Sequence, residues 1–373
     1  MAAKNQGRTP GQMPVMTRQG MFNLATRQTF QRQNVINFQD SSPVFTTLPQ
    51  SGLLGKIRLR FTGTTTTAAA SSATRKTYLP APVGIVRRLI LRSSEGAELF
   101  NTTGYGAYLV SRTLRTNGEF FVNDGNSLIP GAATDPFVRY FNDGGDLGAS
   151  ATTSWTFMLE IPVSLGEQNV TGMILLQNPA TQHQLEVQWG TVTDIYTTTG
   201  TVTLSNVICQ PELEFYQLPA SVMDDPDLSF IHRILETSQS ITATGDQTYT
   251  LPLGGIYLKL IHEMNNGATL APMDISKVNN LKIVYAQSQV PYNMHPDIHL
   301  WRQRRRYGQD LPSAVYVHDF GIGNYLPEEP TSRDLFDTGE ITDMQSILTL
   351  DSSLVLAGSP LLRSIREEIL PSV

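Results

Sequence analysis

Histidines are the residues of this chain best suited to catalysis or metal binding, and two of the six have a spacing that suggests such a role. His295 and His299, in the segment MHPDIH, are four residues apart, which on a helix would place both on one face as metal ligands. Pro296 disfavours a helical conformation at His295, and neither an HExxH arrangement nor a nearby cysteine supplies further ligands. We therefore expect loop or core histidines and no metal site. The other four are His183, His232, His262 and His318.

Other catalytic motifs are missing from the sequence. It contains no GxSxG nucleophile elbow, no GxxxxGKS/T phosphate loop and no GxGxxG fingerprint, since GYGAYL and GIGNYL both lack the last glycine. Cys209 lies in the apolar run VIC without a neighbouring base, as expected of a packed thiol. The carboxylate pairs 224–225 and 328–329 are adjacent residues that point in different directions, so we interpret them as solvated loop charges. The sequence predicts no enzyme, no cofactor and no small-molecule substrate.

A cluster of arginines and aromatic residues is the strongest positive signal. The segment WRQRRRYG could contact phosphate, RNA or an acidic protein surface. From Asp319 onward the chain has ten acidic residues and three arginines, which offers carboxylate partners. Arginine pairing with carboxylates across a subunit or domain boundary is our preferred interpretation, and nucleic acid is the alternative. The predicted subunit-interface residues are Trp301, Arg302, Arg304, Arg305, Arg306 and Tyr307.

The first 39 residues form a basic arm that contains no acidic residue. Early glycines and prolines oppose regular structure there, while apolar residues provide anchors. Two interpretations stay open: the arm orders against a membrane or a neighbouring protein, or it is a frayed terminus. The residues expected to face such a partner are Lys4, Arg8, Arg18, Met21, Phe22, Arg27, Phe30 and Arg32.

Composition indicates a large, weakly charged globular protein. The 373 residues exceed the size of one typical core, so two packed bodies are expected. Charged residues make up 16% of the chain, which excludes a charge-driven disordered protein, and the net charge of -6 argues against a nucleic-acid coat. A single cysteine excludes an intramolecular disulfide framework. Because no apolar window reaches membrane-spanning length and the start lacks a secretory signal, we expect synthesis in a cytosol.

Short strand patterns separated by turn residues predict an all-β fold. In GKIRLRF, Ile57, Leu59 and Phe61 alternate with basic residues, as in a strand with one buried face. The main helical candidate is residues 105–115, and residues 101–154 and 289–312 are expected to be mostly irregular. Prolines and acids in LPASVMDDPD mark a domain boundary, after which a similar strand series returns. We predict a lead-in and arm at 1–50, β-domains at 51–222 and 223–358, and a tail at 359–373.

The tail SPLLRSIREEILPSV has apolar residues at the spacing of a helix. Leu361, Ile365 and Ile369 fall at i, i+4 and i+8, and Leu362 lies beside them. This spacing predicts a short amphipathic helix that contacts a partner surface.

Two segments resemble parts of a known family. WRQRRRYGQDLPSAVYVHDF resembles the arginine-to-strand segment of tectivirus-like major capsid proteins, from tailless, membrane-containing bacteriophages with double-stranded DNA. IVRRLILRSSEGAELFNTTGYGAYLVSRTLRTNG is similar to the strand, turn and helix of that family's first jelly roll. The resemblance implies a double jelly roll, with two eight-stranded β-sandwiches in tandem and a few short helices. It also implies a homotrimeric, pseudo-hexagonal capsomer of an icosahedral shell.

The resemblance further implies where such a subunit is found and what it contacts. The shell would cover an internal membrane that encloses the DNA, so the protein would be part of the virion. Its partners would be other copies of itself, penton and minor capsid proteins, and the inner membrane surface through the arm, without specific nucleic-acid binding. The alternative is a virion spike or carbohydrate-binding host-recognition protein. Trp155, Trp189 and Trp301 lie in or beside core-like runs, which argues against a tryptophan platform for sugars.

Overall fold

The computed structural model describes most of the chain, and strands are its main element. The described residues are 22, 26–76, 82–93, 96–114, 144–166, 170–178, 180–218, 228–267, 271–285, 289–307, 311–320, 336–339 and 341–371. None of the helices within these ranges is long and apolar enough to cross a membrane.

The elements follow one another in two strand series. The strands of the first series are β1 (Gln28–Arg32), β2 (Ile36–Asn37), β3 (Pro43–Thr47), β4 (Leu53–Thr67), β5 (Ser72–Arg75), β6 (Val86–Arg92), β7 (Glu98–Thr102), β8 (Thr152–Pro162), β9 (Ile174–Leu175), β10 (Gln184–Trp189), β11 (Tyr196–Thr199) and β12 (Val202–Tyr216). Those of the second are β13 (Phe230–Ser240), β14 (Gly245–Thr250), β15 (Ile256–Asn265), β16 (Val278–Tyr285), β17 (Gln289–Met294), β18 (Val315–Asp319), β19 (Phe336–Asp337), β20 (Met344–Leu350) and β21 (Leu361–Pro371). The helices are α2 (Gly104–Arg112), α3 (Val192–Ile195) and α4 (Pro296–Tyr307), with 3-10 turns at Val83–Ile85 and Ile275–Lys277.

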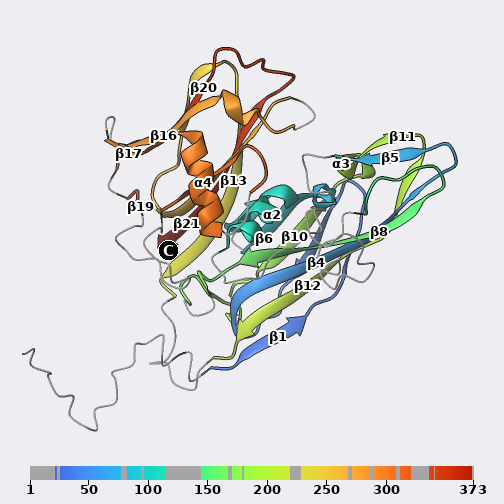
Figure 1. Cartoon of the computed structure of the whole chain (residues 1–373). Helices are drawn as coiled ribbons and strands as arrows, with labels where there is room; N and C mark the ends of the chain where they lie inside the picture. Colours follow the sequence, from blue (N-terminus) through green and yellow to red (C-terminus); the bar gives the residue numbers. More distant parts are fainter. Residues whose placement is uncertain are drawn as a thin grey trace, which may run out of the picture.

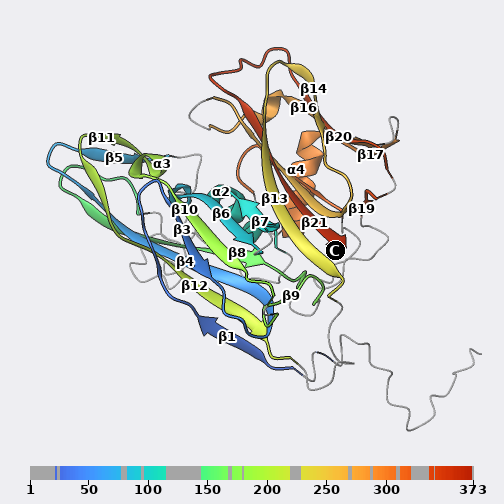
Figure 2. The ribbon, with the colours of Figure 1, turned by 180° about the vertical axis from the view of Figure 1, so that it is seen from behind.

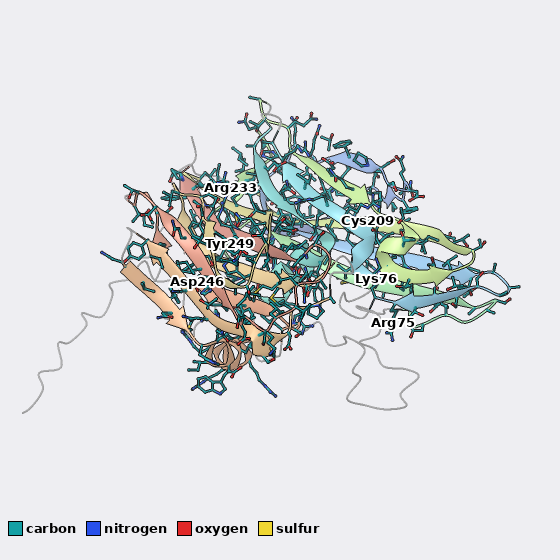
Figure 3. The ribbon with its side chains drawn as sticks, turned by 90° about the horizontal axis from the view of Figure 1, so that it is seen from above. Arg75, Lys76, Cys209, Arg233, Asp246 and Tyr249 are labelled. Carbon is teal, nitrogen blue, oxygen red and sulfur yellow. The ribbon has the colours of Figure 1, made fainter. Side chains whose placement is uncertain are left out.

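Two β-sandwiches share one continuous sheet. In the first sandwich, β1-β12-β4-β8 faces β7-β6-β10-β3; in the second, β18-β15-β21-β13 faces β14-β20-β16-β17. Parallel pairing of β13 with β7, at Ile234↔Phe100 and Leu235↔Asn101, joins one sheet of each into a single nine-stranded sheet. Seen from above, the two bodies lie side by side, with Cys209 in the first and Tyr249 in the second (Figure 3).

Period-2 patterning explains how each strand faces its core. Ile57, Leu59 and Phe61 of β4 are fully buried, while Arg60 between them is exposed. Phe61 stacks on Phe157 of β8 at 4.7 Å and meets the edge of Trp189 of β10 at 5.8 Å. Alternation therefore places large aromatic rings from both sheets in one interior.

The predicted helix at 105–115 is confirmed as α2, which lies between the two sandwiches (Figures 1 and 2). The side chain of Thr103 accepts a hydrogen bond from the Gly106 amide at 3.0 Å and so caps the helix. Gly106 weakens helix propensity, but a Cβ there would lie 2.2 Å from the Glu236 carboxylate of the second sandwich. Glycine thus allows the helix to approach β13 closely.

The predicted C-terminal helix is wrong, because residues 361–371 form strand β21 in the middle of the second sandwich. β21 pairs with β13 on one side and with β15 on the other. A spacing of four residues is an even number, so Leu361, Ile365 and Ile369 also share one face of a strand. Pairing on both edges and burial on both faces outweigh the helical pattern.

Residues 28–47 are part of the first sandwich. β1 and β2 pair with β12, and β3 pairs with β10, so these residues supply strands at the edges of both sheets. Figure 2 shows β1 at the outer edge of the first sandwich. The predicted boundary at residue 222 falls in 219–227, outside the described residues.

The segment 289–312, expected to be irregular, contains β17 and α4. Pro296 is the first residue of α4, where a backbone N–H would have no acceptor within the helix, so the lack of this proton costs no hydrogen bond. His295 precedes the helix. Proline therefore starts this helix rather than breaking it.

Candidate assembly surfaces and the sandwich junction

Helix α4 closes the free edge of the nine-stranded sheet. β18 pairs only with β15 among the described strands, which leaves one row of its backbone groups facing α4. Gln303 accepts a hydrogen bond from the Val317 amide at 2.7 Å and donates one to the Val315 carbonyl at 3.0 Å. His299 donates from Nε2 to the Val317 carbonyl at 2.7 Å. Two helix side chains thus replace a neighbouring strand and protect the edge.

Three residues of the predicted interface cluster form contacts within the second sandwich. Arg306 forms an ion pair with Asp319 at 2.5 Å, and the Tyr307 hydroxyl donates to the same carboxylate at 3.1 Å. Arg302 Nη1 lies 2.9 Å from the Met294 sulfur of β17. These three side chains hold α4 on its own sandwich, and each of them stays partly exposed.

The outward face of α4 carries the remaining members of the cluster. Trp301 is 60% exposed, and the Arg305 guanidinium lies 5.7 Å from the centre of its ring. Arg304 is exposed as well. Ile298, one turn before Trp301, is 56% exposed and was not among the predicted residues, although its i, i+3 spacing from the tryptophan was visible in the sequence. We call Ile298, Trp301 and Arg305 the α4 face.

The second sandwich binds both ends of α2 with opposite charges. At the amino end, Glu236 of β13 accepts hydrogen bonds from the Thr103 amide at 2.7 Å and from its hydroxyl at 2.9 Å. At the carboxyl end, Lys259 of β15 donates to the Thr113 carbonyl at 2.8 Å and pairs with Glu367 at 2.9 Å. An anion at the amino end and a cation at the carboxyl end both complement the helix dipole. This charge arrangement fixes the two sandwiches against each other.

Arg363 of β21 stands at the centre of this junction. Its guanidinium pairs with Glu236 at 3.0 Å, donates a hydrogen bond to Glu263 and lies 5.7 Å from the centre of the Tyr105 ring of α2. Burial alone would lower the pKa of Arg363, but the two carboxylates outweigh burial and raise it. Burial raises the pKa of Glu263, and the charge of Arg363 opposes that rise. The sequence pattern did not reveal this network, because its members are scattered along the chain from Tyr105 to Arg363 and meet only in the fold.

The described residues of the predicted arm divide between the core and the surface. Phe22 is fully buried, 5.8 Å from the Tyr216 ring in a small cluster with Leu53, so its predicted contact with an outside partner is wrong. Phe30 is 54% exposed on β1, with Arg58 5.8 Å from its ring centre. Arg27 and Arg32 are exposed, whereas Lys4, Arg8, Arg18 and Met21 lie outside the described residues.

The predicted tail contacts are internal. Leu362, Ile365 and Ile369 are buried in the second sandwich and Leu361 is half-buried, so they do not form a surface for a partner. Their burial follows from the central position of β21.

Catalytic and sugar-binding chemistry receives little support from the geometry. Burial raises the pKa of the Cys209 thiol, which favours its unreactive form. Within the described ranges, no group of three histidine, cysteine or acidic side chains could hold a metal ion. Trp155 and Trp189 are buried, so neither can form part of a stacking platform for carbohydrate.

Comparison with known proteins identifies the fold. No protein-family model and no curated protein matches the chain. Among solved structures, the major capsid protein of Sulfolobus turreted icosahedral virus has a TM-score of 0.67 at 13% identity, covering 92% of this chain and 97% of its own. The PBCV-1 virus capsid has a TM-score of 0.60 at 11% identity, with 92% and 93% covered. The major capsid protein of bacteriophage PM2 has a TM-score of 0.55 at 10% identity, with 93% and 98% covered.

The chain has the double jelly-roll fold. The four-plus-four strand arrangement of each sandwich and the coverage of nearly the whole chain agree with the fold predicted from the sequence. These structural neighbours are capsid proteins. Identities of this size show the fold alone, and they do not single out tectivirus-like phages.

Proposed function

We propose that this chain is the major capsid protein of an icosahedral virus. The observation that carries the proposal is a pair of jelly rolls fused through one nine-stranded sheet, an arrangement that matches viral capsid proteins over 92% of the chain. The buried junction around α2 and Arg363 supports a mechanical role, because it makes a rigid block of two bodies that would otherwise move independently.

We infer that the block assembles as a homotrimer through the α4 face. Exposed tryptophan and arginine side chains are frequent energetic centres of interfaces, and the α4 face combines both with Ile298. A closed threefold ring of two-sandwich subunits gives six sandwiches with a pseudo-hexagonal outline, whose outer sides are left for lateral contacts in a shell. Penton and minor capsid proteins complete the set of expected neighbours in a virion that encloses a membrane and double-stranded DNA.

The double variant Trp301→Ser, Arg305→Glu should raise the trimer dissociation constant about 100-fold or more. The reason is that tryptophans and arginines in interfaces often contribute about 2 kcal/mol each to the binding free energy. Sedimentation velocity over a concentration series measures this effect. Val355→Ser, at a side chain that is 78% exposed, removes a surface hydrophobe elsewhere and should leave association unchanged. Equal dissociation constants for the wild type and the double variant would remove the α4 face from the interface.

The basic arm is proposed to contact the anionic inner membrane. A cation near such a surface contributes about 1 kcal/mol, so Lys4, Arg8 and Arg18 together would provide substantial, salt-sensitive binding. We expect deletion of residues 1–20 to preserve thermal stability and to weaken cosedimentation with phosphatidylserine vesicles at low salt. Deletion of residues 1–39 removes Phe22 and the pairing of β1 with β12, so it should also destabilise the first sandwich by about 3–5 kcal/mol. Undiminished vesicle binding by the shorter deletion would contradict the membrane contact.

A further inference from the structure

Three buried histidines meet beneath α4 in the second sandwich. His262 comes from β15, His318 from β18 and His299 from α4. The ring centres of His299 and His318 are 4.7 Å apart, and those of His262 and His318 are 5.5 Å apart. Each residue is about 1% exposed. Three buried imidazoles whose rings adjoin are a pattern that neither the capsid proposal nor the junction explains.

The hydrogen bonds of the cluster suit uncharged rings. His262 lies between two serine hydroxyls, with Ser364 3.0 Å from Nδ1 and Ser346 2.9 Å from Nε2. His299 must donate from Nε2 because its partner is the Val317 carbonyl, and its Nδ1 has no partner among the described residues. Neither ring nitrogen of His318 has a hydrogen-bond partner in that part of the chain. A buried imidazole whose nitrogens lack hydrogen-bond partners lowers the stability of the folded protein, which suggests that these histidines have another role.

The side chains that contact the cluster are neutral, and the charge acting on it from α4 is a cation. β20 and β21 contribute the hydroxyls of Ser346 and Ser364, β17 the Tyr292 ring at 5.8 Å from His318, and β18 the Tyr316 ring at 5.7 Å from His299. The charged group acting on His299 and His318 is Arg302 of α4, which is itself a cation. Of the nearby carboxylates, Asp319 binds Arg306 and Tyr307, and Asp297 lies 3.6 Å from His295 Nδ1.

The effect on titration follows from this setting. Burial, with the neighbouring His299, lowers the pKa of His262 to about 3. Burial lowers the pKa of His299 to about 4, partly offset by its bond to Val317. Burial and the two other imidazoles hold the pKa of His318 well below its usual value. All three rings are therefore neutral in the folded protein near pH 7.

We propose that His262, His299 and His318 form an acid-operated latch that releases α4 from the edge of β18. His262 and His318 lie within a paired sheet, whereas His299 lies on a surface helix that contacts the sheet through side chains. Protonation would place like charges about 5 Å apart, beside the Arg302 cation that already acts on His299 and His318. Departure of α4 would let water reach the rings. The helix is the element that can move without breaking strand pairing.

The direction of the pH effect is fixed by the lowered pKa values. The open state takes up protons near the ordinary histidine pKa of about 6.5, while the closed state resists them down to about 4 or below. Closure is thus fully favoured above pH 6.5 and is progressively lost as the pH falls below it. Between pH 7.5 and 5.0 the open population should rise about 30-fold for each histidine that becomes accessible.

Opening would have two structural consequences. The backbone groups of Val315 and Val317 would lose their partners Gln303 and His299, leaving an unprotected sheet edge. The α4 face would also leave its position on the sandwich. If the proposed trimer contact is correct, acid would therefore loosen the capsomer, but release of the helix itself does not depend on the capsid function.

Hydrogen–deuterium exchange of the full-length protein between pH 7.5 and 5.0 tests the latch. After correction for intrinsic exchange rates, the exchange of the α4 and β18 amides should report an open population that is about 30-fold or more larger at pH 5.0 than at pH 7.5. The amides of β4 and β8 in the first sandwich should show no such increase. His318→Phe removes one of the protonatable rings and should therefore reduce the pH-dependent increase of the open population by about 30-fold. His318→Leu provides a second uncharged replacement if phenylalanine is too large for the site. His295→Gln is the matched control, because His295 is exposed just before α4.

Three results would overturn the latch. The first is flat α4 and β18 exchange across the pH range, and the second is a rise that is equal in the first sandwich. The third is an unchanged rise in folded His318→Phe or His318→Leu. Because exchange is read on individual segments, these outcomes are independent of whether the chain forms trimers or shells.

Discussion

Replacing Arg363 with methionine is expected to lower the free energy of unfolding by about 3–5 kcal/mol, the range found when one partner of a buried ion pair is removed. Arg363 is 7% exposed, and its loss would leave Glu236 and Glu263 buried without their shared cation. Glu236 also caps the amino end of α2, so disorder at this carboxylate should spread to the contact between the sandwiches. Urea unfolding at pH 7, followed by circular dichroism, measures the change.

Two further variants test the reason for this loss. Arg75→Met breaks the exposed ion pair with Asp146 and should change stability by about 1 kcal/mol or less. Adding Glu263→Gln to Arg363→Met removes one unpaired charge and should recover part of the lost stability. A methionine variant as stable as the wild type would show that the junction does not depend on this network.

Removing residues 361–373 is expected to prevent folding of the second sandwich. β21 forms the pairs that hold β13 and β15 together, from Phe230↔Pro371 to Asn265↔Leu361. Its loss would separate two strands and expose the core residues Leu260 and Ile234, which are buried in the native protein. Limited proteolysis should cleave the truncated chain throughout its second half, and most of the protein should be insoluble.

The control for this truncation removes only residues 372–373, which follow the last paired residue of β21. That variant should fold and resist proteolysis as the wild type does. A soluble, protease-resistant product lacking residues 361–373 would instead mean that β21 is a dispensable addition to the sandwich.

The strands of the first sandwich could be predicted because their periodicity reflects one local cause. In β4, alternation of Ile57, Leu59 and Phe61 with basic residues encodes one buried apolar face, as the structure shows. The α2 helix was also predictable from its aromatic residues, although the reason for Gly106 was not. That reason is the approach of Glu236, a residue 130 positions away in the chain.

Elements whose character depends on distant pairing could not be predicted. A spacing of four residues fits both a helix and a strand. Leu361, Ile365 and Ile369 lie in a strand because β13 and β15 pair with this segment on either side. The arginines of α4 look equivalent in the sequence, but Arg306 meets Asp319 while Arg305 lies over Trp301. Tertiary contacts thus divide one apparent cluster into a part that anchors the helix and a part that faces outward.

The same argument applies to the histidines. Chain spacing drew attention to His295 and His299, whereas the fold brings His299 together with His262 and His318. Their separation along the chain hides a cluster that only sheet pairing and the docking of α4 create.

Electron microscopy of the purified full-length protein tests the central claim most directly. The account predicts particles of three copies around a threefold axis, with six sandwiches in a pseudo-hexagonal outline and α4 at the contacts between subunits. Isolated two-sandwich monomers at every concentration would contradict it.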